Sequence, residues 1–206
     1  MRQNIFIMFV FMVCCKLLMN DMMVRGKDIK VSSAIALVLY YTLFRYFPSS
    51  TNALLGKVSK KMRYLCCKKI FKHCGRNVNI ERGAFFGWGT NIEIGDNSGI
   101  GINCFLPANT KIGDNVLMGP NVYILYRNHS FSSTKIPIIN QGYSDAKQVL
   151  IEDDVWIGRD VLMTPGRIVR KGSIIAAGTI LCKNFPEYSI VGGNPSKLIR
   201  IRTDEV

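Results

Sequence analysis

The chain has 206 residues, of which 48% are hydrophobic and 10% aromatic, which suits one core of ordinary size plus an appendage. Its formal net charge of +13 is uneven, because residues 1–77 carry 14 Lys and Arg against Asp21 and Asp28, whereas residues 78–206 are close to neutral. The seven cysteines form no C-x-x-C pair, so they indicate neither a disulfide framework nor a zinc site and fit a reducing cytoplasm.

Two apolar runs lie in the first third of the chain, at residues 5–15 and 31–44. Each is shorter than the roughly 20 residues that span a bilayer, so neither predicts a transmembrane helix. The first run follows Arg2, as in a signal peptide, but no small-residue cleavage site comes after it. An alternative is that the native chain starts at Met22 or Met23.

A basic stretch follows, in which eight Lys and Arg and no acidic residue lie between Lys57 and Arg76, interleaved with apolar residues at helical spacing. The pattern predicts a helix with a basic and an apolar face. Such a helix could only cap the next domain, or could cap it and also lie on an anionic membrane surface, where each Lys or Arg contributes about 1 kcal/mol. A nucleic-acid interface is not indicated, because no recognisable binding fold surrounds the charge. We expect residues 1–77 to form a helical segment ahead of a main domain at residues 78–206.

In the main domain, aliphatic residues recur at every sixth position, first from Ile92 to Ile124 and again from Val149 to Leu181. One row consists of Ile94, Ile100, Leu106, Ile112, Met118 and Ile124, and then of Ile151, Ile157, Met163, Val169, Ile175 and Leu181. A second row of apolar or small residues lies two positions ahead. A period of six fits neither an amphipathic helix nor a hairpin series. With Gly, Asp and Asn in the turns, it predicts a mostly β fold, a parallel β-helix whose inward rows stack as ladders.

Arg167 departs from this pattern, because it stands at a row position that calls for a small or aliphatic residue. A buried and unpaired guanidinium would be costly. We therefore expect the coil to bulge at Arg167 or the guanidinium to meet a carboxylate.

The period is interrupted between Ile124 and Val149, which leaves a loop at residues 125–148. A long loop held by ordered coils on both sides is usually functional. His129 lies near the start of this loop and is of a residue type suited to accept a proton at neutral pH. Because His73 is the only other histidine, a zinc site with three histidines is not expected.

Several motifs occur in order along residues 75–202. They are Ile112-Gly113-Asp114-Asn115-Val116, Met118-Gly119-Pro120-Asn121-Val122, Asn128-His129, Asp154-Val155-Trp156-Ile157-Gly158, Thr164-Pro165-Gly166 and the stretch VGGNPSKLIR at 191–200. In these motifs the chain resembles the hexapeptide acyltransferases, in the branch of galactoside, maltose and serine O-acetyltransferases. The resemblance is closest to bacterial enzymes that acetylate sugars of surface polysaccharides. It implies left-handed winding, a homotrimer and an acetyl-CoA donor, with no metal.

The resemblance also implies roles for individual residues. His129 would be the general base that activates an acceptor hydroxyl for direct attack on the thioester of acetyl-CoA. The residues implied to bind the cofactor are Trp156, Gly158, Ala177, Gly178, Lys183 and Arg200. Small residues would let the pantetheine arm approach the coil, and the two cations would pair with the phosphates of the nucleotide end.

The expected function is that of an acetyl-CoA-dependent O-acetyltransferase acting on a sugar hydroxyl of a surface polysaccharide or its lipid-linked precursor. We expect it in the cytoplasm, with the N-terminal segment as a point of peripheral contact with the inner face of the membrane. Two alternatives stay open: an N-acyltransferase that acts on an amino sugar, and a non-catalytic trimeric scaffold docked on the membrane.

Overall fold

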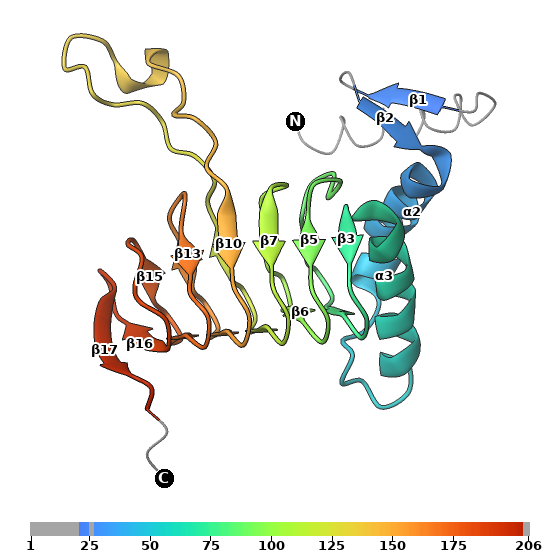
Figure 1. Ribbon diagram of the computed structural model, residues 1–206. Helices are drawn as coiled ribbons and strands as arrows, with labels where there is room; N and C mark the ends of the chain where they lie inside the picture. The colour runs from blue at the N-terminus through green and yellow to red at the C-terminus, as the bar shows by residue number, and fades with distance from the viewer. Residues whose placement is uncertain (1–20, 25–26, 204–206) are drawn as a thin grey trace.

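The structure is a computed structural model that describes residues 21–24 and 27–203. The apolar run at residues 5–15 lies outside the described residues. A hairpin of β1 (Asp21–Val24) and β2 (Lys27–Lys30) leads into α2 (Val31–Thr42), the short η1 (Phe44–Tyr46) and α3 (Gly56–Ile70). In Figure 1, α2 and α3 stand side by side at one end of a long coiled domain.

That domain is a left-handed parallel β-helix with three walls. The first wall contains β3 (His73–Cys74), β5 (Glu93–Ile94), β7 (Thr110–Ile112), β10 (Val149–Ile151) and β13 (Ile168–Val169). The second wall contains β4 (Asn79–Ile80), β6 (Gly99–Ile100), β8 (Leu117–Met118), β11 (Trp156–Ile157), β14 (Ile174–Ile175), β16 (Ser189–Gly192) and the antiparallel β17 (Lys197–Ile201). The third wall contains β9 (Tyr123–Ile124), β12 (Leu162–Met163) and β15 (Ile180–Leu181). The first of these strands, β3, comes directly after α3.

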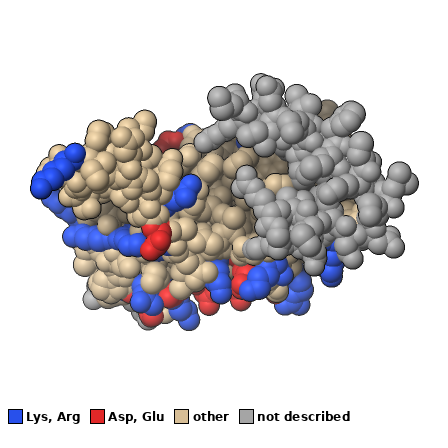
Figure 2. Space-filling model, turned by 90° about the horizontal axis from the view of Figure 1, so that it is seen from above, with Lys and Arg blue, Asp and Glu red and all other residues tan. Residues whose placement is uncertain are grey.

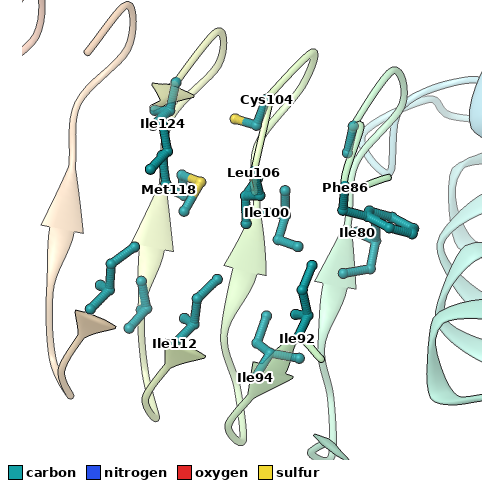
Figure 3. Packing of buried hydrophobic residues seen from close by; sticks show 14 of the residues in the cluster. Ile80, Phe86, Ile92, Ile94, Ile100, Cys104, Leu106, Ile112, Met118 and Ile124 are labelled. Carbon is teal, nitrogen blue, oxygen red and sulfur yellow. The ribbon is translucent and has the colours of Figure 1, made fainter. Parts of the chain in front are cut away.

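The predicted ladders are confirmed. Ile94 pairs with Ile112, Ile112 with Ile151, and Ile151 with Val169, and all four side chains are at most 4% exposed. Figure 3 shows the rows stacked inside successive coils. Each coil alone would leave its apolar side chains in water, and so the stack buries them only as a unit. Asn115 illustrates the turns, because its φ of +57° lies in the left-handed region that Asn tolerates.

The two helices close the N-terminal end of this core, as the capping alternative predicted. Tyr40 of α2 is fully buried with its ring centroid 4.7 Å from that of Phe86, and Phe71 packs on the same ring at 4.8 Å. Trp88, in the coil that the helices cover, packs against the same core. The cap therefore shields apolar side chains that an open β-helix would expose.

The expected division of α3 into a basic and an apolar face is wrong at three positions. Val58 and Leu65 are 52% and 46% exposed, although they belong to the apolar residues of the stretch. Arg63, expected on the basic face, is fully buried. Helical spacing cannot predict the burial of Arg63, because the groups that bind its guanidinium come from other segments of the chain.

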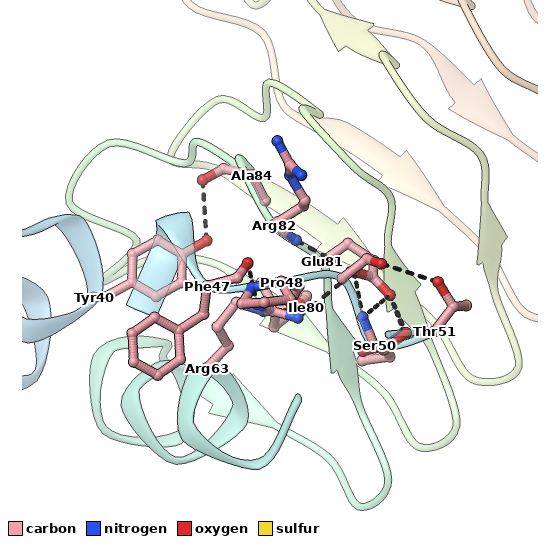
Figure 4. Close-up of polar contacts among 12 residues, drawn as sticks. Tyr40, Phe47, Pro48, Ser50, Thr51, Arg63, Ile80, Glu81, Arg82 and Ala84 are labelled. Atoms are coloured by element: carbon pink, nitrogen blue, oxygen red, sulfur yellow. Dashed lines mark hydrogen bonds and ion pairs between the residues drawn. The ribbon is translucent and has the colours of Figure 1, made fainter. Parts of the chain in front are cut away.

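The Arg63 guanidinium joins three segments (Figure 4). It donates hydrogen bonds to the carbonyl oxygens of Phe47, Pro48 and Ile80, and its Nη2 lies 3.6 Å from Oε2 of Glu81. Glu81 also accepts hydrogen bonds from Ser50. Burial by itself would raise the pKa of Glu81, but the hydrogen bonds from Ser50 and Asn79 and the charge of Arg63 outweigh it and hold the pKa below its usual value. This cluster fixes α3 to the first coil.

Candidate active site

Residues 125–148 form an arm that projects from one edge of the β-helix (Figure 1). The chain leaves the third wall after β9 and returns to the first wall at β10, so the arm replaces one corner of a coil. Its two limbs are held together by backbone hydrogen bonds from Ser130 to Gly142 (3.1 Å) and from Ser144 to Asn128 (2.9 Å). A short helix, η2 (Ile138–Asn140), lies near its tip. The arm therefore has ordered limbs that can hold a side chain in place.

His129 lies on the first limb, opposite Tyr143 on the returning limb. The two ring centroids are 4.2 Å apart, and the Arg127 guanidinium lies 4.1 Å from the centroid of the Tyr143 ring. Among the described residues, no carboxylate is hydrogen-bonded to the imidazole. Glu152 is engaged elsewhere, because Arg170 donates to it at 3.0 Å. The imidazole is thus oriented by ring packing and is exposed to solvent.

A cavity of about 400 Å³ lies between the base of the arm and the corresponding corner of the next coil. Its lining includes His129, Ser144 and Lys147 from the arm, and Thr164 and Arg167 from the corner. An acceptor seated there would contact both the histidine and the β-helix. The cavity is therefore the candidate acceptor site.

Arg167 lies at this corner and meets no carboxylate among the described residues, contrary to one of the two expectations. Its Nη1 donates to the carbonyl oxygen of Cys182 at 2.8 Å, while Nε and Nη2 donate to that of Pro165 at 3.3 and 3.1 Å. Because β13 is the last strand of the first wall, the side chain can turn toward the rim and line the cavity instead of entering the core. The backbone carbonyls satisfy part of its hydrogen-bonding capacity.

Five of the six residues expected to bind cofactor lie on the second wall or in the turns next to it. Trp156 is 51% exposed and pairs with Ile174, which pairs with Ile190, and Ile190 in turn pairs with Arg200. Trp156 and Arg200 therefore share one outward row. Gly158 packs tightly against the next coil, since a Cβ there would come within 2.5 Å of the backbone nitrogen of Ala177. Ala177 and Gly178 follow in an exposed turn, where Gly178 has a φ of +71°. Gly158 is therefore covered by the next coil, whereas the turn at Ala177 and Gly178 is open to a slender chain.

The sixth residue, Lys183, lies at another edge of the β-helix. It follows β15 at the corner between the third and first walls, which is the edge that carries the arm. Its Nζ lies 5.6 Å from the centroid of the Phe185 ring. Lys183 is next in sequence to Cys182, whose carbonyl oxygen accepts from Arg167.

Sequence reasoning gave no role to Cys182, which is exposed at this edge. A hydrogen bond with the Ser196 hydroxyl lowers the pKa of its thiol, whereas burial raises the pKa of Cys66 and Cys74 to about 11 and that of Cys104 to about 12. We therefore expect iodoacetamide at neutral pH to modify Cys182 first among the cysteines of the described region. Peptide mass spectrometry would measure this, with Cys182→Ser as the control. Faster labelling of any of the other four, which include the fully buried Cys67, would contradict it.

Two family descriptions match the repeat blocks. "Bacterial transferase hexapeptide (six repeats)" matches residues 91–125, and "Hexapeptide repeat of succinyl-transferase" matches residues 148–183. The matched blocks lie on either side of the arm. Both descriptions are of hexapeptide repeats in transferases, in agreement with the β-helix.

Curated relatives share part of this region. The chain is 42% identical to a chloramphenicol acetyltransferase of Agrobacterium fabrum over 64 residues, which are 31% of each protein. It is 38% identical to a putative acetyltransferase of Saccharomyces cerevisiae over 88 residues, 43% of each. The chain thus matches less than half the length of these relatives.

Solved structures match over most of the chain. A maltose O-acetyltransferase from Clostridium difficile 630 has a TM-score of 0.66 at 26% identity, covering 84% of this chain and 87% of that one. A galactoside acetyltransferase in complex with coenzyme A has a TM-score of 0.69 at 27% identity, covering 84% and 82%. The chain is therefore similar over most of its length to solved maltose and galactoside O-acetyltransferases, and its two repeat blocks match hexapeptide-repeat descriptions of transferases.

Proposed function

We propose that this protein is an acetyl-CoA-dependent O-acetyltransferase that acts on a sugar hydroxyl of a surface polysaccharide or its lipid-linked precursor. The observation that carries the proposal is the cavity beside His129, formed where the arm interrupts the repeats of an acetyltransferase fold. The similarity to maltose and galactoside acetyltransferases supports a sugar as the acceptor class.

In the proposed reaction, the imidazole of His129 takes the proton from the acceptor hydroxyl as its oxygen attacks the thioester carbonyl carbon. The tetrahedral intermediate then collapses, the carbon–sulfur bond breaks, and CoA leaves as the thiol with the proton from the imidazole. No acyl-enzyme forms. Packing of the His129 ring on Tyr143 would keep the imidazole directed at the acceptor, which favours proton transfer in the correct geometry.

The donor would lie along the second wall. Trp156 and Gly158 would flank the pantetheine arm, Ala177 and Gly178 would let it approach the coil, and Arg200 would pair with phosphate. Lys183 would contribute to the donor site from a neighbouring copy. In the homotrimer that the resemblance implies, neighbouring copies would thus share each site.

Exposed apolar side chains support the trimer. On the outer faces of the walls, Leu117 and Trp156 are 65% and 51% exposed, and near the end of the arm Phe131 and Ile139 are 70% and 82% exposed. Seen from above, the arm presents a mostly uncharged surface (Figure 2). Contiguous exposed apolar groups mark interaction sites, and a second copy of the chain would cover both surfaces.

Release of free CoA from acetyl-CoA in the presence of a panel of nucleotide sugars and lipid-linked sugars tests this proposal. We expect release that depends on the acceptor. Release only with amino sugars would favour the N-acyltransferase alternative. The absence of release with every acceptor, although CoA binds, would contradict the enzyme and favour the scaffold.

We also propose that the N-terminal cap contacts the inner face of the cytoplasmic membrane. Leu54, Leu55 and Val58 are 91%, 50% and 52% exposed around the start of α3, close in sequence to the exposed Lys57 and Lys61. No helix in the described part of the chain combines the length and apolarity needed to cross a bilayer. We propose a peripheral contact, made by apolar insertion and by attraction to anionic lipids.

Cosedimentation with phospholipid vesicles measures this contact. The protein should bind phosphatidylglycerol vesicles more strongly than phosphatidylcholine vesicles, and the double variant Leu54→Ser, Val58→Ser should bind less. Leu198→Ser, which changes an exposed leucine on β17, is the matched control. If the double variant and the wild type bound phosphatidylglycerol vesicles equally, residues 54–58 would not be the site of membrane contact.

A further inference from the structure

The cavity beside His129 has an excess of positive charge. Lys147 and Arg167 both line it, and none of its lining residues is acidic. Within the described residues, neither cation forms an ion pair with a carboxylate. Two cations that face a small cavity without a neutralising group are suited to a ligand that brings negative charge.

Arg167 is not explained by packing in the core. Ile168 pairs with Leu150, so the residues just before them, Arg167 and the buried Val149, lie at the same level of the wall. An aliphatic side chain at position 167 would continue the row of Val149. Its three hydrogen bonds to the carbonyl oxygens of Pro165 and Cys182 fix the plane of the guanidinium. One N–H on each Nη is left without a hydrogen bond to any described residue. A guanidinium held in this way is preorganised to bind an oxyanion through two donors.

Lys147 approaches the cavity from the other side. Its backbone N–H donates to the carbonyl oxygen of Tyr126 at 2.8 Å, which fixes it at the base of the arm. Its aliphatic stem lies over Gly166, where an added Cβ would come within 2.8 Å of Cδ. The arm and the corner therefore each present one cation to the same space.

We infer that this cavity selects an acceptor that carries an anionic group, a carboxylate or a phosphate, close to the hydroxyl that is acetylated, with Arg167 and Lys147 as the residues that determine this specificity. The inference rests on the proposed function. Suitable acceptors are sugar acids and sugar phosphates. The phosphates of CoA are a poor alternative, because the pantetheine arm separates them from the thioester that must reach His129.

Titration calorimetry of the CoA-bound protein with glucose, glucuronate and glucose 1-phosphate tests the inference without depending on turnover. We expect at least one of the two anions to bind about 10-fold or more tightly than glucose. Arg167→Val, which restores the aliphatic residue of the ladder, and Lys147→Met should each weaken binding of that anion by about 10- to 100-fold. Affinity for glucose and for CoA should be unchanged.

The matched controls are Arg170→Gln, just after β13, and Lys135→Gln, on the arm. Both remove exposed cations that lie outside the cavity. They should preserve the preference for the anion. Equal affinity for all three sugars would overturn the inference, and so would the absence of detectable binding of any of them. Loss of CoA binding in Arg167→Val would also overturn it, because the cations would then belong to the donor site. If the protein preferred the anion but transferred acetyl to no acceptor, the proposed function would be contradicted. The inference of an anion-binding cavity would still hold.

Discussion

Replacement of His129 by Ala should lower kcat for acetyl transfer by about 10²- to 10⁴-fold, the usual contribution of a general base. The hydroxyl of a sugar is a weak nucleophile, and within the described residues no second histidine lines the cavity that could remove its proton. Because His129 is exposed on an ordered arm, its removal should not unfold the protein. Initial rates at saturating acetyl-CoA and acceptor would measure the change.

His73→Ala is the matched control, since it removes the other histidine, which is exposed on β3 at the far end of the first wall. The control should keep wild-type activity, and both variants should keep wild-type affinity for CoA. Equal kcat for His129→Ala and the wild type would remove His129 from the mechanism, whatever the acceptor.

Arg63→Met should lower the free energy of unfolding by about 3–5 kcal/mol, the cost of breaking a buried ion pair from one side. The variant leaves the Glu81 carboxylate without its cation and removes the donors to Phe47, Pro48 and Ile80. Denaturation in urea would measure the change. Lys61→Met, an exposed substitution on the same helix, should cost less than about 0.5 kcal/mol. A similar small change in both variants would show that the buried cluster does not hold the cap.

Glu81 should make this stability depend on pH. Because its folded-state pKa is lowered, its contribution is present above its unfolded pKa of about 4.3 and is lost as the pH falls through the lower folded value. In Glu81→Gln this acid-induced loss should be smaller than in the wild type. Identical slopes of stability against pH below about pH 5 would contradict the assignment.

The ladder could be predicted from the sequence because every inward position of a β-helix meets an equivalent position one coil above and one below. Ile94, Ile112 and Ile151 therefore follow one rule wherever they occur. The cap follows no such period. Arg63 was assigned to a basic face because its spacing fits one, but carbonyl groups 15 to 17 positions away along the chain decide where it lies.

The candidate site was predictable in part for the same reason. His129 could be recognised because it lies where the six-residue period stops. Trp156 and Gly158 could be recognised because they lie on a regular coil, in a motif that resembles one of the hexapeptide acyltransferases. Lys147 gave no signal, since nothing in an aperiodic loop shows that its returning limb folds back over Gly166. The edge on which Lys183 lies depends on which wall contains β15, and the motifs of the sequence do not show this.

The most direct measurement is the mass and chemical stability of the acceptor after incubation with acetyl-CoA and the wild-type protein. We expect the acceptor to gain one acetyl group for each CoA released, and mild alkali to remove that group, because it would be an ester on a hydroxyl. An acetyl group that resists mild alkali would show transfer to nitrogen. An acceptor of unchanged mass, while CoA binds to the protein, would contradict acetyl transfer at this site.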